Sequence, residues 1–460
     1  MTALAAIRPW LLRNFIMPVG DLVWESGMMR RLALLERAQW WDRVTLYKER
    51  DRLLSEVVAT AYREVPFYQD LMDRHKVLPK DIRAPEDLRR LPIVTKEMIR
   101  SAYPRLVTRS TGHRTWEERT SGSTGTNFRV LEDAPTAGWY RASFLLSLEW
   151  AGWRFGEAHL QTGMTLKRGL QKRLKDALLN CHYLSAYMLD DASLDAGLDL
   201  IWRRGIRHLW GYPGSLYYLA RRAKERGRNT RMQTLVTWGD SLYPHYRETI
   251  ESAFGTSVHD TFGCAEGMQI AAQCGQGDTY HLHALDVIVE CVDDCGEPVP
   301  AGRPGHLILT RLHAGPMPLI RYRVGDLGTL MSEADTCRCG RGFPLLKNIQ
   351  GRDTDVVVTP SGNRLIVHFF TGVLEHFTEI DTFQVEQHSA GTIVLRIVPF
   401  QPIPEDLVGQ IRKALWDKGA AGLEIDVQLV DAIPLTSGGK RRFIIRHLAL
   451  SPDRRDDVQR

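Results

Sequence analysis

Helical patterns and short apolar strands alternate through residues 136–260, and this alternation constrains the fold more than any other feature of the sequence. Residues 235–238 (LVTW) are typical of these strands. Strands that alternate with helices predict βαβ units and a largely parallel sheet, so we expect an α/β fold. The chain has 460 residues, of which 43% are hydrophobic, and is therefore long enough for a substantial core and more than one domain.

The pattern changes after residue 355. A helix is predicted at residues 405–416, among strands at residues 383–386, 392–398 and 425–430. These elements indicate a small α+β unit at the carboxyl-terminal end of the chain.

We therefore divide the chain into two domains. Residues 1–352 are expected to form the large domain, with a helical leader at residues 1–53. In the continuation of this leader, Pro66 is expected to stop a helix. The small domain is expected at residues 353–446, followed by a charged tail at residues 447–460.

The charge balance argues against some classes of function. The chain has 60 basic and 55 acidic residues, a formal net charge of +5, and no long block of one sign. Nucleic-acid binding usually requires a concentrated basic surface, so it is not indicated. The sequence contains no run of about 18 apolar residues, so no transmembrane helix is expected.

Residues 1–24 mix apolar and basic side chains. Pro9 and Pro18 are expected to bracket about two helical turns. This segment is either a membrane-surface helix or a helix packed on the body, and its short length favours packing. Arg13 interrupts the apolar stretch, and no clear small-residue cleavage site follows it, so we expect no signal peptide and a cytoplasmic location.

Residues 119–127 (RTSGSTGTN) have the chemistry to hold phosphate. Glycines let the backbone approach an anion, while hydroxyl and main-chain N–H groups donate to its oxygens. The stretch is not a Walker sequence, because Thr126 and not a lysine follows the last glycine, and the nearest downstream cation is Arg129. Taken alone, it fits a flexible linker better than a binding site. The candidate phosphate-binding residues are Thr120, Ser121, Gly122, Ser123, Thr124 and Gly125.

Four further motifs follow this stretch in a fixed order. They are residues 260–266 (DTFGCAE), 322–326 (YRVGD), 351–355 (GRDTD) and 434–440 (PLTSGGK). The succession resembles the adenylate-forming superfamily of acyl-CoA synthetases, peptide-synthetase adenylation domains and luciferases. Within it, the chain is most similar to the phenylacetate-CoA ligase branch and its relatives in capsular-polysaccharide clusters. The resemblance implies a large adenylate-forming domain with layered βαβ sheets and a small mobile α+β lid.

The resemblance also implies a reaction. A carboxylic acid and ATP would form acyl-AMP and pyrophosphate with magnesium, and the acyl group would then pass to coenzyme A. Two alternatives stay open: transfer to an amine or hydroxyl acceptor, and a non-catalytic nucleotide-binding homologue in a polysaccharide cluster. The last is favoured by Ala265, where the family usually has a hydroxyl residue, and by the missing basic residue beside the phosphate stretch. The presence of Glu266, Asp326, Arg352 and Lys440 opposes it. Residues 210–217 and 238–263 are expected to supply the acyl pocket.

The resemblance assigns roles to particular residues. Glu266 would be the magnesium ligand, since this ion prefers hard oxygen donors. Phe262 would stack on adenine, Asp326 would accept the ribose hydroxyls, and Arg352 would contact ribose or phosphate. Lys440 would neutralise charge on the α-phosphate and the attacking carboxylate. The other implied nucleotide-binding residues are Gly239, Asp240, Thr261 and Gly263. Any of these residues by itself is also typical of a turn or a strand end.

The cysteines indicate a metal site. Their number, seven, is odd, which fits reduced thiols or metal binding better than a set of disulfides. Three thiolates and one imidazole would close a tetrahedral structural zinc site, although the wide sequence spacing is also compatible with separate side chains. His283 competes as the imidazole ligand, and Cys291 and Cys295 would serve in a different pairing. The expected zinc ligands are Cys274, His281, Cys337 and Cys339.

Overall fold

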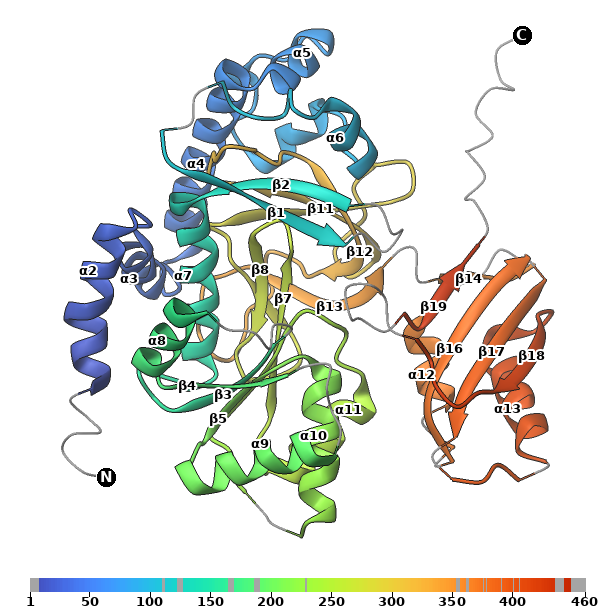
Figure 1. Cartoon of the computed structure of the whole chain (residues 1–460). Helices are drawn as coiled ribbons and strands as arrows, with labels where there is room; N and C mark the ends of the chain where they lie inside the picture. Colours follow the sequence, from blue (N-terminus) through green and yellow to red (C-terminus); the bar gives the residue numbers. More distant parts are fainter. Residues whose placement is uncertain are drawn as a thin grey trace, which may run out of the picture. The chain divides into compact units, whose positions relative to one another are not determined.

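The computed structural model divides the chain into two compact units, Met1–Ile349 and Gln350–Arg460 (Figure 1). The boundary falls inside strand β13 (Leu345–Arg352). The structure describes residues 8–109, 112–121, 127–163, 169–185, 191–227, 230–352, 356–360, 364–374, 376–377, 379–389, 391–399, 401–404, 406–434 and 442–447.

A large sheet organises the first unit. Besides β13, its strands are β3 (His159–Gly163), β4 (Cys181–Ser185), β5 (His208–Gly211), β6 (Thr234–Thr237), β7 (Val258–Cys264), β8 (Met268–Gln273), β9 (Tyr280–Leu282), β10 (Val287–Val292), β11 (Pro304–Arg311) and β12 (Tyr322–Leu330). Among the described residues it has eleven strands in the order β10-β11-β12-β13-β9-β8-β7-β6-β5-β3-β4.

The direction of the strands changes in the middle of this sheet. From β4 to β7 all neighbours are parallel, as the alternation of helices and strands predicts. The pairs β7–β8, β8–β9, β9–β13, β10–β11 and β11–β12 are antiparallel. The prediction of a largely parallel sheet therefore holds only for residues 136–260. A short connection such as that between β7 and β8 can join only antiparallel neighbours.

Helices accompany the parallel strands. They are α8 (Leu170–Leu179), α9 (Asp191–Arg204), α10 (Pro213–Glu225) and α11 (Pro244–Phe254). Figure 1 shows α9, α10 and α11 beside β3, β5 and β7. Pro213 and Pro244 each lie at the start of their helix, where the missing N–H of proline costs nothing because the first turn has no acceptor for it.

A separate hairpin precedes the large sheet. It pairs β1 (Thr115–Ser121) with β2 (Asn127–Asp133), and Ser121 lies opposite Asn127. The next element, α7 (Ala134–Trp150), begins directly after β2 because the Asp133 carboxylate accepts the backbone N–H of Thr136 at 2.8 Å and caps the helix. The cap therefore fixes the direction in which the chain passes from β2 into α7.

The helices of the leader and of its continuation up to residue 102 are η1 (Leu12–Ile16), α2 (Met17–Val23), α3 (Met28–Ala38), α4 (Arg43–Glu64), α5 (Pro66–Arg74), η2 (Pro79–Asp81), η3 (Pro85–Arg90) and α6 (Lys96–Ala102). Helix α4 ends before Pro66, as predicted. Leu32, Leu35 and Leu54 are buried in the same core cluster as the strands of the sheet. The leader is therefore part of the first unit.

The prediction that Pro18 ends the first helix is wrong. Residues 8–23 are continuously helical, and Pro18 lies at the second position of α2. The preceding turn, η1, is a π-helix. Its wider hydrogen-bond spacing accommodates a proline, which cannot donate a backbone N–H and clashes with the previous turn of a regular α-helix.

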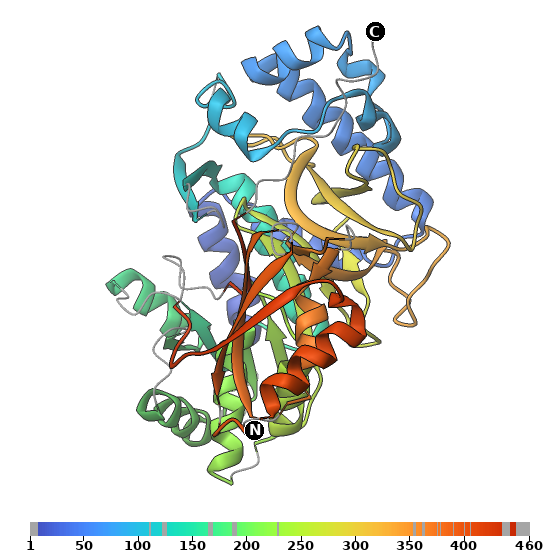
Figure 2. The same cartoon turned by 90° about the vertical axis from the view of Figure 1, so that its right-hand side faces the viewer.

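The second unit has the α+β composition expected from the sequence. Its small hairpin pairs β14 (Val356–Val358) with β15 (Arg364–Ile366). Its four-stranded sheet has the order β18-β17-β16-β19 and appears in orange and red in Figure 2. The strands are β16 (Ile380–Ser389), β17 (Thr392–Pro399), β18 (Glu424–Leu429) and β19 (Ile444–Arg446), and the helices are α12 (Val367–Leu374), α13 (Leu407–Leu415) and η4 (Trp416–Ala420).

Candidate functional site

Two neighbouring parallel strands bring predicted residues to one edge of the sheet. Gly239 and Asp240 follow β6, and Thr261, Phe262 and Gly263 belong to β7. The carboxyl ends of adjacent parallel strands meet at the same edge, where ligands of open α/β sheets bind. The turn after β6 requires glycine, because Gly239 has φ +75° and a side chain would meet a tyrosine ring carbon at 2.9 Å.

The side chains at this edge differ in exposure. Asp240 is exposed and accepts the backbone N–H of Ser241 at 2.9 Å. Phe262 is half-buried and Gly263 is exposed. Thr261 is buried, and its hydroxyl donates to the carbonyl of Thr237 at 2.8 Å. The hydroxyl of Thr261 therefore joins β6 to β7.

Asp260, the residue before Thr261, also forms hydrogen bonds within the sheet. Its carboxylate accepts hydrogen bonds from the hydroxyls of Thr237, at 2.5 Å, and Tyr280, at 2.6 Å. Burial raises the pKa of Asp260. Trp210 is likewise buried, stacked on His159 with ring centroids 4.1 Å apart. These side chains consolidate the sheet beneath the candidate site.

Glu266 lies in the turn between β7 and β8, and its carboxylate is buried. The hydroxyl of Tyr322, at the start of β12, donates to Glu266 Oε1 at 2.7 Å. Burial and the negative charge of Glu266 raise the pKa of Tyr322 far above its ordinary value. The hydroxyl of Tyr322 therefore stays protonated and holds one carboxylate oxygen in place.

Asp326 lies on the same strand as Tyr322 and is half-buried. Its negative charge also contributes to the raised pKa of Tyr322, after burial and Glu266. Glu266 therefore contacts the hydroxyl of Tyr322 directly, and Asp326 lies four residues further along the strand that carries Tyr322. The hydrogen bond between Tyr322 and Glu266 joins two residues that the sequence separates by more than fifty positions.

A buried ion pair fixes the Glu266 turn to the β1–β2 hairpin. Arg311 Nη1 donates to Glu132 Oε1 at 2.7 Å, and Arg311 Nη2 donates to the carbonyl of Gly267 at 2.9 Å. Glu132 belongs to β2, just beyond the glycine-rich stretch. Burial opposes the charge of Arg311, but Glu132 outweighs it and the pKa of Arg311 is raised. Gly267 must be glycine, because a Cβ there would lie 2.3 Å from Glu132 Oε1.

Sequence reasoning did not identify Arg311, Glu132 or the bond from Tyr322. Arg311 and Glu132 are 179 positions apart, so no local pattern joins them. Both residues lie next to apolar residues in strand sequences, and a buried charge normally has a partner. This pattern could have indicated that each has a charged partner, but not which one.

Several predicted residues lie partly or wholly outside the described part of the chain. Thr120 and Ser121 end β1, and only their backbone is described. The same holds for Arg352 at the end of β13. Lys440 lies outside the described residues, as do Gly122, Ser123, Thr124 and Gly125.

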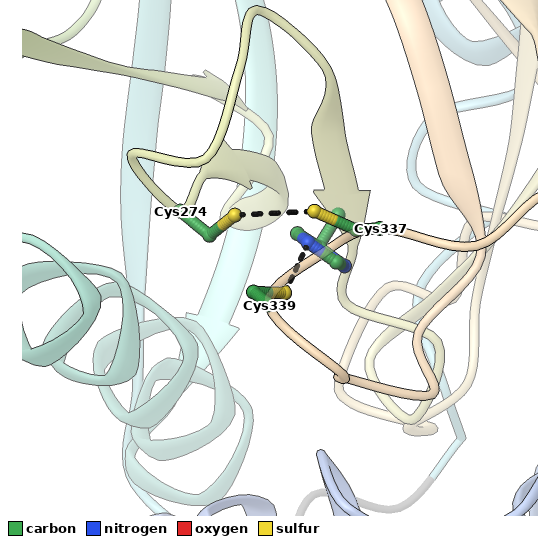
Figure 3. A group of neighbouring side chains, drawn as sticks. Cys274, Cys337 and Cys339 are labelled. Carbon is green, nitrogen blue, oxygen red and sulfur yellow. Dashed lines mark hydrogen bonds between the residues drawn. The ribbon is translucent and has the colours of Figure 1, made fainter.

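The predicted metal ligands converge. Cys274 follows β8, His281 lies on β9, and Cys337 and Cys339 lie between β12 and β13. The four possible ligand atoms all lie within 4.8 Å of one another. Figure 3 shows the three cysteine side chains pointing toward a common centre. Cys274 Sγ lies 3.6 Å from Cys337 Sγ, and Cys339 Sγ lies 3.2 Å from His281 Nε2.

These separations fit a tetrahedral ion. Zinc–sulfur bonds of about 2.3 Å place two sulfur ligands roughly 3.8 Å apart, close to the spacing of Cys274 and Cys337. Burial lowers the pKa of His281 to about 4, so its imidazole is neutral, as a metal ligand must be. The donor set thus suits zinc in number, softness and spacing.

The competing ligands lie elsewhere. His283 Nε2 is 3.0 Å from Ser147 Oγ, and its ring stacks on Trp150. Cys291 Sγ lies 3.4 Å from the carbonyl of Gly328. Among the described residues, neither His283, Cys291 nor Cys295 belongs to the cluster.

Comparisons with known proteins agree with this architecture. Residues 357–447 match the family model of the CapK C-terminal domain. The chain is 28% identical to the phenylacetate-coenzyme A ligase of Thermus thermophilus, over 68% of this chain and 73% of the relative. It is 21% identical to the CapK protein of Staphylococcus aureus, over 83% of this chain and 85% of the relative.

Solved structures share the fold. A 2-hydroxyisobutyryl-CoA ligase in the postadenylation state superposes with a TM-score of 0.73 and 20% identity, covering 89% of this chain and 91% of that chain. The amide bond synthetase McbA from Marinactinospora thermotolerans gives a TM-score of 0.50 and 19% identity, covering 70% of this chain and 66% of that chain.

The order of the sequence motifs, the two units and these relatives lead to one assignment. The match to the CapK model lies in the second unit, whereas the similarity to the phenylacetate-CoA ligases and to CapK extends over most of the chain. These similarities support an assignment to the adenylate-forming superfamily, on the phenylacetate-CoA ligase branch and related to CapK.

Proposed function

We propose that this protein is an AMP-forming ligase that activates a carboxylic acid with ATP and then transfers the acyl group, with coenzyme A as the acceptor. In the first step a carboxylate oxygen bonds to the α-phosphorus of ATP, the bond to the β-phosphate breaks, and pyrophosphate leaves. In the second step the thiol sulfur bonds to the acyl carbon, AMP leaves, and the thiol proton passes to solvent.

One observation carries this proposal. The hydroxyl of Tyr322 holds the buried carboxylate of Glu266, at a turn that Arg311 ties to the strand following the glycine-rich stretch, and Asp326 lies on the same strand as Tyr322. A nucleotide needs this combination of separate groups for its phosphates and its ribose. The relatives named phenylacetate-coenzyme A ligase support the same class of reaction.

The residues have distinct roles in the proposal. Asp326 accepts the ribose hydroxyls, and Phe262 stacks on adenine near Gly239, Asp240, Thr261 and Gly263. The glycine-rich stretch, with Thr120 and Ser121 at its start, donates hydrogen bonds to the phosphates. Arg352 contacts the ribose or a phosphate. The hydroxyl of Thr261 already donates to the carbonyl of Thr237.

Lys440 stabilises the first step in this proposal. Its ammonium group compensates the charge that develops as the carboxylate approaches the α-phosphate, and losing one contact of this kind typically slows a reaction by roughly 10² to 10³. The second unit is a mobile lid that carries Lys440 toward the nucleotide for adenylation and away for transfer.

Magnesium would be held by the carboxylate of Glu266. This residue fits the ion, because it offers hard oxygen donors and Tyr322 fixes one of them. When bound, the ion would neutralise phosphate charge. The chain's own contribution is to hold the carboxylate still, through Tyr322 on one side and the Arg311–Gly267 bond on the other.

Carboxylate-dependent exchange of labelled pyrophosphate into ATP tests the first step without knowledge of the acceptor. We expect exchange with one class among aryl, arylacetic, fatty and amino acids. Lys440→Ala should abolish it, whereas Lys413→Ala, an exposed lysine of α13, should not. Absence of exchange with every acid, despite measurable ATP binding, would favour a non-catalytic nucleotide-binding homologue. Ala265 supports that alternative, because the family usually has a hydroxyl residue at this position.

A second acceptor class is an amine or a hydroxyl. The fold shared with an amide bond synthetase is the observation that favours it. Once the acid is identified, product analysis with coenzyme A and with a panel of amines and sugars separates the two. Acyl-CoA, AMP and pyrophosphate as the products support coenzyme A, and an amide or ester formed without coenzyme A supports the alternative.

We also propose that Cys274, His281, Cys337 and Cys339 bind a structural zinc ion. Four protein ligands leave no position for water or substrate. Two residues beyond Cys339, Arg341 lies over the rings of Trp40 and Trp150, at 5.1 and 5.0 Å from the ring centroids. The loop that carries Cys337 and Cys339 therefore contacts the leader through Arg341 and Trp40, and the ion would stabilise both segments.

A further inference from the structure

The amino-terminal helix exposes most of its apolar side chains. Leu11, Phe15, Val19 and Leu22 follow one another at spacings of four, four and three residues, so they form one stripe along the helix, and all are exposed. Leu22 is 81% exposed. In the described segment 8–24 only the side chain of Leu12 is buried. In this segment the packing on the body expected from the sequence is made by buried Leu12 and half-buried Met17.

The ends of this helix carry aromatic rings. Trp10 and Trp24 are both exposed, the latter to 71%. Trp10 makes an edge contact with Phe15, with ring centroids 5.3 Å apart, so the two rings form one apolar surface. Tryptophan prefers the interface between water and lipid, because its ring is apolar and its N–H is polar.

Helix α8 has a similar exposed face with added positive charge. Leu170, Leu174 and Leu178 recur every four residues and are exposed, Leu170 to 74%. None of the described side chains of α8 is buried. Its exposed charges are Lys172, Arg173 and Lys175, against one half-buried aspartate, Asp176.

The two helices are joined. Arg8 Nη2 donates to the carbonyls of Ala177 and Leu178 at the end of α8, at 2.5 and 2.9 Å. Both helices lie on the same side of the first unit (Figure 1). We call the side chains of residues 10–24 and 170–178 together the amino-terminal face. It holds eleven of the sixteen exposed large hydrophobic side chains in the described part of the chain.

We propose that the amino-terminal face binds the surface of a membrane that contains anionic lipids. The stripe and the tryptophans enter the boundary between headgroups and acyl chains, and the basic residues of α8 contact the acidic headgroups. Within the part of the chain that the structure describes, no helix has both the length and the apolar character needed to span a membrane.

Charge favours lipid over a second copy of the chain. A two-fold pairing of α8 with itself would oppose Lys172, Arg173 and Lys175 with their own copies, and like charges at an interface are unfavourable. Arg13 on the amino-terminal helix is already paired with Glu36 and with Glu149, the latter at 3.0 Å. An anionic surface instead matches the net positive charge of α8, which carries Lys172, Arg173 and Lys175 against Asp176.

Co-sedimentation of the full-length protein with vesicles tests the proposal. We expect binding to vesicles of phosphatidylcholine with added phosphatidylglycerol, and about tenfold less to phosphatidylcholine alone. The double variant Phe15→Ser, Trp24→Ser should lose about tenfold or more of the binding, and so should Lys172→Glu combined with Lys175→Glu. Val44→Ser, at an 80% exposed position of α4, is the control and should bind normally.

Three results would overturn the proposal. The first is no binding to either kind of vesicle, and the second is binding that none of the variants changes. The third is a dimer in light scattering that Phe15→Ser, Trp24→Ser dissociates, since the face would then be covered by a second copy. Thermal melting shows that the variants are folded, and we expect no change because the substituted side chains are exposed. This inference does not depend on the proposed ligase activity.

Discussion

Tyr322→Phe is the substitution that best tests the architecture of the candidate site. It removes one hydroxyl and leaves the buried ring in place. The lost hydrogen bond, 2.7 Å from Tyr322 to Glu266, has a charged and buried acceptor. Bonds of this kind typically contribute about 1.5–3 kcal/mol, and the carboxylate left behind keeps its desolvation cost. We therefore expect the free energy of unfolding to fall by about this amount.

The same substitution should change activity in a characteristic way. Without the hydroxyl, the Glu266 carboxylate is free to rotate, so the proposed magnesium ion should bind less tightly. In the pyrophosphate exchange assay we expect the magnesium concentration required for half-maximal rate to rise by roughly tenfold, the equivalent of about 1.4 kcal/mol. Raising magnesium should restore part of the rate.

Tyr68→Phe is the matched control. Tyr68 is also fully buried, and its hydroxyl donates to the carbonyl of Pro318 at 3.1 Å and accepts the N–H of Ile320 at 2.9 Å. It should lose stability by about 1 kcal/mol with no change in the magnesium requirement. If both variants shift the magnesium requirement equally, or if neither does, the positioning role of Tyr322 is wrong.

Three further predictions concern the lid, the metal and pH. Lys440→Ala should abolish formation of acyl-adenylate yet leave transfer from supplied acyl-adenylate largely intact, which rapid-quench assays of the two half-reactions measure; equal loss in both would argue against a moving lid. Metal analysis should find one zinc ion per chain, which Cys339→Ala should lose and the control His388→Ala should retain. His388 is exposed and lies beside the Glu386 carboxylate, which is already paired with Arg396. Retention of zinc by Cys339→Ala would remove this ligand from the proposed set. Burial raises the pKa of Asp286 from its ordinary 3.8 to about 7, so the folded state holds this proton more tightly than the unfolded state does. Its contribution to stability is therefore complete below about pH 4 and declines as pH rises to about 7, and Asp286→Asn should flatten the dependence of unfolding free energy on pH in that window; a variant with the same slope as the parent protein would contradict the assignment.

Local sequence patterns were sufficient where the cause of structure is local. Alternating helices and strands predicted the parallel part of the sheet, Pro66 predicted the end of α4, and the change of pattern after residue 355 predicted the α+β composition of the second unit. The chemistry of thiolate and imidazole likewise pointed to Cys274, His281, Cys337 and Cys339 as a group, although it left His283 as an alternative.

Other features depended on residues far apart in the chain. The choice of His281 over His283 followed from the packing of β9, which turns one ring toward the cysteines and the other toward Ser147 and Trp150. The first helix continues through Pro18 after a π-turn, whereas proline spacing alone predicted the wrong end.

Sequence by itself determined the types of residue available for binding nucleotide and metal, and the strands and helices on which they lie. Tertiary structure decided which of them meet. The bonds from Tyr322 to Glu266 and from Arg311 to Glu132 and Gly267 cross from one strand to another, and the exposure of the amino-terminal face depends on what the body leaves uncovered. A buried charge requires a partner, but the identity of that partner is fixed by the folded sheet and not by neighbours in sequence.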